Sequence, residues 1–384
     1  MRLGIFGGTF NPPHMGHVEA AAACVQALRL DALWLMPTGI PPHKALPEGS
    51  ASASQRLDMA RLAAQAIPKG AACGLELERQ GASYTVDTLR GIRAQRPEDA
   101  LWLVIGSDML LSFERWREYR EIAKMVRLAV VSREAGDRPA LEEKAAWLTL
   151  DCGAEIDFVD NAVNKVSSTA ARAGEADALP PGVPEYVVRN LLYSDDARLA
   201  ALRQMARERL SSRRLAHVLG TEACAAAMAL RFGERELDAR TAALLHDITK
   251  EVPLDQQLQM CAARGIMPDY PETSLDALLH ADTAAILAED ELRQPEHICD
   301  AIRYHSTGRP HMSRLEKIIY VADKIEQTRQ YADVPPIRAL AEQDLDAATA
   351  AVLRGALAAL ARQGRPPYGR TQDALESVAG WQGD

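Results

Sequence analysis

The chain has 384 residues, of which 47% are hydrophobic and 25% are charged, close to the average of soluble globular proteins. Its formal net charge of -9 argues against broad, phosphate-driven binding of nucleic acid. The six cysteines lie far apart and form no C-x-x-C pair, which favours reduced thiols in a reducing compartment. We find neither a signal peptide nor an apolar run of membrane-spanning length, so we expect a cytoplasmic protein with no membrane partner.

Short apolar runs alternate with helical stretches through the N-terminal half of the chain. A helix is predicted from His14 to Leu30, between a glycine-rich turn and the second apolar run. Buried strands are predicted at residues 2–6, 32–37, 101–105, 128–131 and 156–159. Because a strand, a turn, a helix and a parallel strand form a βαβ unit, we expect an α/β Rossmann-like domain with a mostly parallel sheet. Ligands of such sheets bind outside the carboxyl ends of the strands.

The character of the sequence changes after about residue 195, where strand-like runs almost vanish. Long segments then show helical spacing, as in Leu345, Thr349 and Val352, which predicts an all-α domain. The tail contains Pro366 and Pro367 with few apolar anchors. We therefore expect a nucleotide-binding domain at 1–193, a helical domain at 197–365 and an irregular tail at 366–384.

Two glycines and two histidines form the first candidate site. Gly7 and Gly8 follow the first strand, and His14 and His17 open the helix. The glycines let backbone N–H groups approach a phosphate, and the helix N-terminus adds partial positive charge. Three residues apart, the histidines share one helix face, where two imidazoles can hold oxygens of a phosphate whose charge grows in the transition state. The string is neither a P-loop nor a G-x-G-x-x-G fingerprint.

This string resembles the nucleotidyltransferase superfamily with the H-x-G-H signature. Over Gly7–His17 it is similar, in particular, to bacterial nicotinate-mononucleotide adenylyltransferases. Further segments match that family in chain order: Pro41–Lys44, Ser83–Leu89, Ile105–Asp108, Trp116, Val131–Arg133 and Ser167–Thr169. The competing interpretation is another adenylyl- or cytidylyltransferase, such as the pantetheine-phosphate type, and Ser83–Leu89 argues against it. One departure is Ala171, which stands before Arg172 where the family usually has a larger aliphatic residue.

The resemblance implies transfer of AMP from ATP to nicotinate mononucleotide, with Mg²⁺ on the triphosphate and no protein nucleophile. The products would be nicotinate adenine dinucleotide, an intermediate of NAD biosynthesis, and pyrophosphate. Catalytic roles are implied for His14, His17, Lys44 and Arg133. ATP contacts are implied for Gly7, Gly8, Thr9, Phe10, His14, His17, Gly106, Asp108, Arg133, Ser167, Ser168, Thr169 and Arg172. Mononucleotide contacts are implied for Lys44, Tyr84, Thr85, Asp87 and Trp116.

Four histidines and two aspartates in the helical half form a second candidate site. They are His217, His246, Asp247, His280, His305 and Asp323. The pair His246-Asp247 follows an apolar helical run, so it must be paired or ligated if it is buried. Four imidazoles and two carboxylates suit a pair of transition-metal ions with one bridging carboxylate, a type of centre used for phosphate hydrolysis.

The order H…HD…H…H…D resembles the HD phosphohydrolase superfamily. The segments Leu245–Lys250, Ile302–Gly308 and Leu315–Glu326 are similar to bacterial symmetrical diadenosine-tetraphosphate hydrolases. That resemblance implies a di-iron centre, cleavage of diadenosine tetraphosphate to two ADP, and a phosphate-facing role for Lys250. Two alternatives remain: the helical domain acts on another nucleotide, or it is a nucleotide-sensing module. The sequence also leaves open a homo-oligomer and the choice between nicotinate and nicotinamide mononucleotide.

Overall fold

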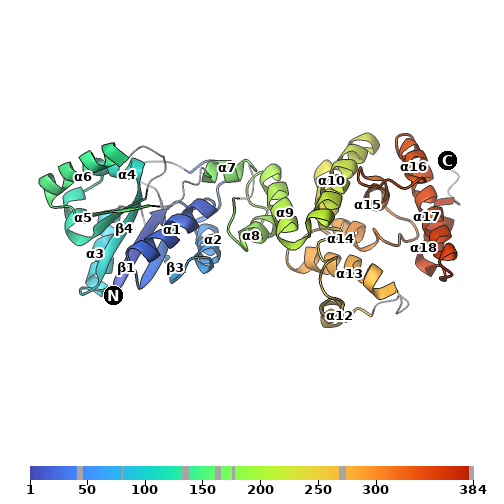
Figure 1. The fold of residues 1–384 in the computed structure, drawn as a ribbon, viewed down its shortest axis with the longest axis horizontal. Coiled ribbons are helices and arrows are strands. Elements are labelled where there is room, and N and C mark those ends of the chain that lie inside the picture. The colour runs from blue at the N-terminus through green and yellow to red at the C-terminus, as the bar shows by residue number, and fades with distance from the viewer. Residues whose placement is uncertain are drawn as a thin grey trace. The chain divides into compact units, whose positions relative to one another are not determined.

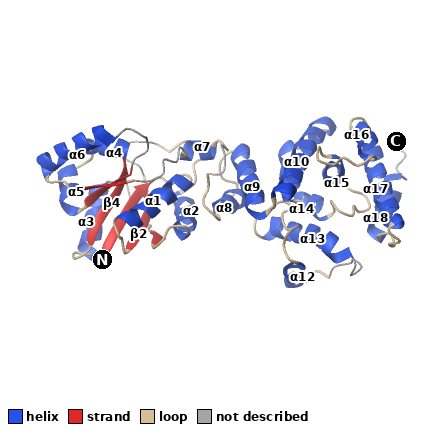
Figure 2. Cartoon of the chain, in the orientation of Figure 1, coloured by secondary structure: helices blue, strands red, loops and turns tan. Residues whose placement is uncertain are grey.

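The computed structural model of the chain describes residues 1–40, 46–79, 81–131, 138–160, 166–174, 178–267 and 274–379. The chain divides into two compact units, Met1–Ala200 and Ala201–Asp384. None of the described helices is both long and apolar enough to cross a membrane. Figure 1 labels the elements along the chain, and Figure 2 shows that strands occur in the N-terminal unit, whereas the other unit is helical in its described part.

A parallel sheet forms the centre of the N-terminal unit and confirms the predicted fold class. In the described residues it has six strands in the order β3-β2-β1-β4-β5-β6, all parallel to their neighbours. The strands are β1 (Arg2–Gly8), β2 (Ala32–Pro37), β3 (Gly70–Ala72), β4 (Ala100–Gly106), β5 (Arg127–Val131) and β6 (Ile156–Val159). The sequence did not predict β3, because its Gly-Ala-Ala segment carries no β-branched or aromatic side chain.

Helices cover both faces of this sheet because successive strand side chains point to opposite faces. Leu101 and Leu103 of β4 belong to one core cluster, and Trp102 and Val104 belong to the other. The first cluster includes side chains of α3, α5 and α6, and the second includes those of α1 and α2. The helical elements of this unit are α1 (Met15–Ala27), α2 (Ala53–Gln65), α3 (Thr85–Gln95), α4 (Ser107–Leu111), η1 (Phe113–Arg115), α5 (Tyr119–Met125), α6 (Arg138–Cys152), α7 (Ser168–Arg172) and α8 (Val183–Arg189).

The boundary between the units falls within α9 (Asp195–Arg209). The second unit then continues with α10 (Ser212–Phe232), α11 (Glu236–Leu245), α12 (Leu254–Ala263), α13 (Leu275–Asp290), α14 (Glu296–Arg303), α15 (Arg314–Ile325), α16 (Val334–Ala341), α17 (Leu345–Arg362) and α18 (Gly369–Ala379). The predicted irregular tail is wrong, because most of its described part is α18. Ala374 and Val378 of this helix are buried, and Thr371 Oγ1 donates a hydrogen bond of 2.8 Å to the Thr307 carbonyl. These contacts connect the helix to the rest of the unit.

Candidate functional sites

The glycine-rich loop lies where the topology of the sheet places ligand sites. The strand order runs outward in opposite directions from β1 and β4, so the switch point lies between these neighbours. In open α/β sheets, ligands bind outside the carboxyl ends of the strands at such a point. β1 ends at Gly8, and His14 stands at the N-cap of α1 with an extended backbone. The predicted phosphate loop therefore connects β1 to a helix N-terminus at the switch point.

The two histidine rings of this loop lie against each other, with ring centroids 3.7 Å apart. The backbone N–H of His14 donates a hydrogen bond of 3.2 Å to Nδ1 of His17. Since Nδ1 accepts, a neutral His17 carries its proton on Nε2. His17 can therefore offer an N–H donor to a phosphate oxygen, as the sequence predicts.

Arg56 of α2 holds the loop from inside the protein. Its guanidinium donates to the carbonyls of Thr9, at 2.8 Å, and Thr38, at 2.7 Å, through Nη1. Nη2 donates to the carbonyl of Gly39 at 3.1 Å. Arg56 is only 1% exposed, so its guanidinium makes these bonds from a buried position. The arginine thus ties the residues that follow β1 to those that follow β2.

The predicted Ser167–Arg172 segment braces the same loop from the other side. Ser167 caps α7 by accepting from the N–H of Ala170. Ser168 Oγ donates to the Pro12 carbonyl at 2.9 Å, and Arg172 Nη1 donates to the Asn11 carbonyl. Arg172 is therefore engaged in positioning the loop, and its predicted contact with ATP stays a prediction.

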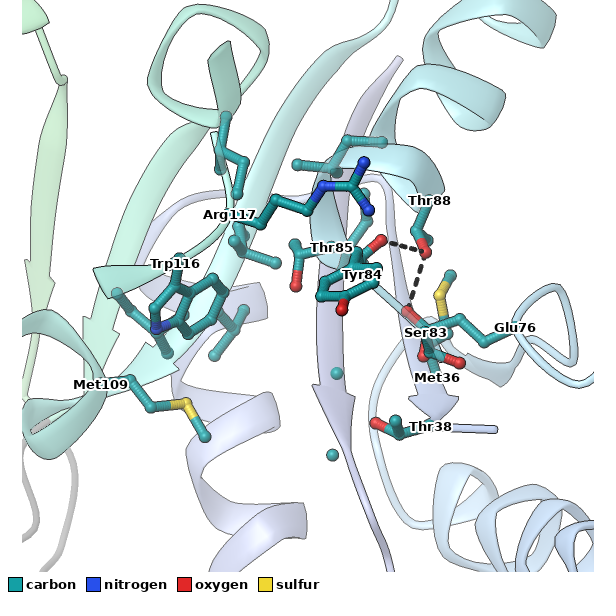
Figure 3. Close-up of a pocket in the computed structure, with 18 of the residues that line it drawn as sticks. Met36, Thr38, Glu76, Ser83, Tyr84, Thr85, Thr88, Met109, Trp116 and Arg117 are labelled. Carbon is teal, nitrogen blue, oxygen red and sulfur yellow. Dashed lines mark hydrogen bonds between the residues drawn. The ribbon is translucent and has the colours of Figure 1, made fainter. Parts of the chain in front are cut away.

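A pocket of about 320 Å³ opens beside the loop. Figure 3 shows Trp116 and Tyr84 as two separate aromatic side chains of its wall, with Thr85 next to Tyr84. The same pocket is lined by Gly7, Gly8 and Thr9, so the phosphate loop and the aromatic residues face one cavity. This size is within the range of small-molecule sites. Three of the predicted mononucleotide residues thus line a cavity that reaches the predicted phosphate loop.

Other predicted residues of this site lie elsewhere. Asp87 is not among the described lining residues, and its carboxylate lies 3.4 Å from Arg90. The Phe10 side chain is buried against His17, so its side chain serves packing. Asp108 is exposed in the first turn of α4, directly after Gly106 ends β4. Two predicted residues, Lys44 and Arg133, lie outside the described residues, as do the rest of Pro41–Lys44 and Ser132.

The structure also places residues in this pocket that the sequence analysis did not select. They are Glu76, Thr88, Met109 and Arg117 among others. Thr88 falls within the matched Ser83–Leu89 segment, and Arg117 follows Trp116 directly, so their neighbours in the chain were the available signal. Glu76 carried no such signal. It is buried, accepts a hydrogen bond of 2.9 Å from Thr88 Oγ1, and burial raises the pKa of its carboxyl group.

The six predicted metal ligands come together inside the second unit, and all six are buried. Each is contributed by a helix or by the turn at its end, which fixes the backbone that carries the ligand. His217 lies in α10, His246 and Asp247 directly follow α11, His280 lies in α13, His305 follows α14, and Asp323 lies in α15.

The two oxygens of Asp247 face two different groups of ligands. Oδ2 lies 3.7 Å from His217 Nε2 and 3.5 Å from His246 Nε2. Oδ1 lies 3.1 Å from His280 Nε2 and 3.8 Å from His305 Nε2. In each group the two Nε2 atoms are close, at 3.3 Å for the first pair and 3.2 Å for the second.

Asp323 completes the first group, with Oδ1 lying 3.0 Å from His217 Nε2 and 3.9 Å from His246 Nε2. Each of the two groups, His217-His246-Asp247 and Asp247-His280-His305, has the compactness of a set that could hold one metal ion. Asp247 belongs to both groups. This arrangement fits two ions bridged by one carboxylate.

Contacts of the second ring nitrogen prepare three of the histidines for this role. Nδ1 of His246 lies 2.6 Å from the Ala243 carbonyl, and Nδ1 of His305 lies 2.7 Å from the Ile302 carbonyl. A carbonyl only accepts, so each Nδ1 carries the proton and leaves the Nε2 lone pair free for a ligand bond. Nδ1 of His217 makes the same kind of contact with Glu326, at 3.0 Å.

The charges of the cluster also suit a metal centre. Burial lowers the pKa of His246 and His280 and lowers that of His305 well below its ordinary value. For His217, burial opposes protonation, but the hydrogen bond to Asp323 prevails and raises the pKa. For Asp247, burial opposes ionisation, but the neighbouring imidazoles prevail and hold the carboxyl pKa well below its usual range. Neutral imidazoles and ionised carboxylates are the forms that bind metal ions. The residues therefore fit a divalent metal pair.

Lys250 contacts one of the candidate metal ligands, whereas the resemblance implies that it faces a phosphate. Its Nζ donates to the Ala277 carbonyl at 2.9 Å and lies 3.0 Å from Nδ1 of His280. The lysine thus reaches a ring nitrogen of one candidate ligand, and its predicted phosphate contact would require the side chain to turn. Burial lowers its pKa.

Two arginines and one glutamate that were not predicted from the sequence also surround the cluster. Arg214 Nη1 donates to Asp247 Oδ2 at 2.7 Å, and Arg329 Nη2 donates to Asp323 Oδ1 at 3.0 Å. Glu326 is 1% exposed and accepts from the backbone N–H of Thr328 as well as contacting His217. The available signal was helical spacing, because Arg214 precedes His217 by three residues and Glu326 follows Asp323 by three.

Two family models match the chain. A cytidylyltransferase-like model matches residues 5–174, and an HD domain model matches residues 214–328. The first range includes the phosphate loop, the aromatic pocket and Arg172. The second includes all six candidate ligands and Glu326.

Curated relatives cover the N-terminal half. A probable nicotinate-nucleotide adenylyltransferase of Neisseria meningitidis serogroup A is 36% identical over 196 residues, which are 50% of this chain and 98% of the relative. A probable nicotinate-nucleotide adenylyltransferase of Shewanella pealeana is 35% identical, covering 51% of this chain and 98% of the relative.

Among solved structures, a crystal structure described as a predicted HD superfamily hydrolase involved in NAD metabolism, from Clostridium acetobutylicum, is 30% identical with a TM-score of 0.44. It covers 47% of this chain and 95% of that one. Over its N-terminal half, the chain belongs to the nicotinate-nucleotide adenylyltransferase family, and it continues into an HD domain.

Proposed function

We propose that the N-terminal unit transfers AMP from ATP to nicotinate mononucleotide, giving nicotinate adenine dinucleotide and pyrophosphate. The observation that carries this proposal is the shared cavity, in which Gly7 and Gly8 of the phosphate loop meet Tyr84 and Trp116. The near-complete coverage of the Neisseria relative at 36% identity supports it.

The reaction needs positioning and charge stabilisation. A phosphate oxygen of the mononucleotide attacks the α-phosphorus of ATP, the bond to the bridging oxygen breaks, and pyrophosphate leaves. Mg²⁺ on the triphosphate would neutralise part of its negative charge. The loop amides and His17 Nε2–H would donate to the oxygens on which negative charge grows. A flat pyridine ring can stack on Trp116. Arg56 and Arg172 would keep the loop in place.

The test is an assay of the purified full chain with ATP, Mg²⁺ and nicotinate mononucleotide, with the dinucleotide and pyrophosphate measured separately. Equal amounts of both products support adenylyl transfer. Release of inorganic phosphate without a dinucleotide would contradict it.

For the HD unit we propose metal-dependent hydrolysis of a phosphoanhydride, with diadenosine tetraphosphate as the substrate and two ADP as products. The six buried ligands in two groups around Asp247 carry this proposal. Two ions held there, for which we propose iron, would stabilise the negative charge of the phosphate groups as Lewis acids. Arg214 and Arg329 add positive charge beside the ligand carboxylates, which suits an anionic substrate.

This proposal is tested by metal analysis of the full chain, followed by product analysis with diadenosine tetraphosphate and other nucleotides. Two equivalents of metal and release of ADP as the product support it. If the metal-loaded protein binds diadenosine tetraphosphate without hydrolysing it, the result favours a nucleotide-sensing module. Preferential cleavage of another nucleotide would assign a different substrate.

A further inference from the structure

Arg117 places a cation on the wall of the aromatic pocket. Among the described lining residues, only Arg117 and Glu76 carry ionisable charges of Arg, Lys, Asp or Glu. The central carbon of the guanidinium lies 4.6 Å from the centre of the Tyr84 ring, and Figure 3 shows Arg117 above Tyr84. A guanidinium stacked on an aromatic face keeps the N–H donors at its edge available.

The acidic neighbours of Arg117 leave these donors largely unused. Its closest carboxylate oxygens belong to Glu118, at 3.7 Å, and Asp87, at 3.9 Å, and it makes no hydrogen bond to another described residue. Arg90 is a closer partner of both, at 2.5 Å from Glu118 and 3.4 Å from Asp87. Of the two arginines beside Glu118 and Asp87, Arg117 is therefore the one whose N–H donors remain available to a ligand.

The rest of the pocket wall selects the ligand group that Arg117 would meet. Most of the wall is apolar or aromatic, including Met36, Leu103 and Met109 beside Trp116, and this suits a flat ring. The other charged group, Glu76, is engaged with Thr88 inside the protein. A carboxylate on the ring would find its only described cationic partner in Arg117. A carboxamide in the same place has only one oxygen acceptor, and its NH₂ group would face the N–H donors of the guanidinium.

We infer that Arg117 contacts the carboxylate of the pyridine ring and makes the transferase prefer nicotinate over nicotinamide mononucleotide. Arginine binds a carboxylate through two parallel N–H···O bonds, which an amide cannot accept. This inference rests on the proposed adenylyl transfer and names the residue that selects its substrate.

The experiment compares full-length wild type with Arg117→Met and the matched variant Arg120→Met, measuring kcat/KM for both mononucleotides with ATP. We expect Arg117→Met to lower kcat/KM for the acid by at least about tenfold, mainly through KM, with a smaller change for the amide. Arg120→Met keeps the wild-type ratio, because the exposed Arg120 pairs with Asp151 and is not among the described lining residues.

An unchanged acid-to-amide ratio in Arg117→Met would overturn the inference. Failure of the proposed function gives a different result, since wild type would then convert neither mononucleotide. Calorimetric binding of the two mononucleotides without ATP separates these cases. Selective loss of affinity for the acid in Arg117→Met supports the inference independently of turnover, and equal affinities in wild type contradict it.

Discussion

In both sites Nε2 of the histidines faces the proposed ligand, but the sites differ in whether that nitrogen carries the proton. In the phosphate loop, Nδ1 of His17 accepts from the His14 backbone, so the proton lies on Nε2. In the metal cluster, Nδ1 of His246 and His305 donates to a carbonyl, so Nε2 has a free lone pair. The first arrangement suits an anion and the second suits a metal ion. The chemistry of each imidazole is thus set by a neighbour of the other nitrogen.

Replacing His17 by alanine removes the proposed Nε2–H donor. We expect kcat for adenylyl transfer to fall by about a hundredfold or more, as when one donor to a developing oxyanion is removed, with a smaller change in the KM for ATP. Steady-state kinetics measure both. Near-normal turnover by a folded variant would show that His17 has no such role.

Glu326 is a positioning residue whose substitution should weaken metal binding. Glu326→Gln keeps the size of the side chain but removes the negative charge beside His217 Nδ1. Loss of such a carboxylate typically costs about ten- to a hundredfold in metal affinity, which we expect for the ion of the His217 group. A Cβ on Gly220 would lie only 2.5 Å from Glu326 Oε2, so the carboxylate occupies space that a larger residue would fill.

Competition with a chelator measures the affinity of each metal equivalent. Glu289→Gln is the matched control, because Glu289 pairs with Arg264 at the surface of the same unit. Equal affinities in Glu326→Gln and wild type would refute the positioning role.

At the scale of the elements, both sites depend on what holds the ends of helices and strands. The phosphate loop carries no regular structure of its own between β1 and α1, and Arg56 of α2 bonds the carbonyl of Thr9 within it. In the HD unit, His246 and Asp247 follow α11, and His305 follows α14. Helix packing therefore sets the separation of these ligands.

We expect Arg56→Met to destabilise the N-terminal unit and to misplace the loop. The carbonyls of Thr9, Thr38 and Gly39 would lose their buried donor. Unpaired buried carbonyls cost about 1–3 kcal/mol each, but removing a buried charge offsets part of this, so the free energy of unfolding should fall by about 2–4 kcal/mol.

Denaturant unfolding and the kcat/KM for ATP measure the two effects. Arg61→Met, on the same helix, provides the control, because Arg61 is exposed and pairs only with nearby Asp58 among the described residues. Its change should stay within about 0.5 kcal/mol. Equal stabilities of the two variants would contradict the bracing role of Arg56.

At the scale of the whole molecule, the two candidate sites are contained in separate compact units. The phosphate loop and aromatic pocket lie within Met1–Ala200, and the six candidate metal ligands lie within Ala201–Asp384. Each unit therefore contains its own candidate site. We expect a substitution in one site to abolish the activity of that unit and to leave the activity of the other unit unchanged.

Asp247→Ala tests this independence. Without the shared carboxylate, the protein should lose both metal ions or hold one weakly, and ADP release should fall by about a thousandfold or more. Adenylyl transfer should stay at the wild-type rate once Mg²⁺ is supplied. Metal content and both activities are measured on the same preparation. Full metal content with full hydrolysis would refute the ligand assignment, and reduced adenylyl transfer would reveal coupling between the units.

The sequence by itself determined the parallel α/β fold of the first half and the helical nature of the second. Buried strands such as Leu101–Ile105 and helical repeats such as Leu345, Thr349 and Val352 are local patterns whose period directly reflects the geometry of the backbone. His14 and His17 were visible for the same reason, because they are neighbours on one turn, whereas the six candidate metal ligands were selected by the order of their residue types along the chain. The edge strand β3 and the helix α18 were missed, since their order comes from neighbours distant in the chain.

Only the tertiary structure decided which side chains meet across long separations. Arg56 lies 47 residues from Thr9, and Glu326 lies 109 residues from His217, so no local pattern joins these pairs. The structure also leaves Asp87 out of the described pocket lining, although it lies within a matched segment, and places Arg117 in it, although Arg117 only follows the matched Trp116. Burial and hydrogen-bond partners are properties of the packed chain. They fix the tautomer of each histidine and the partner of each carboxylate, which residue types and spacing alone do not specify.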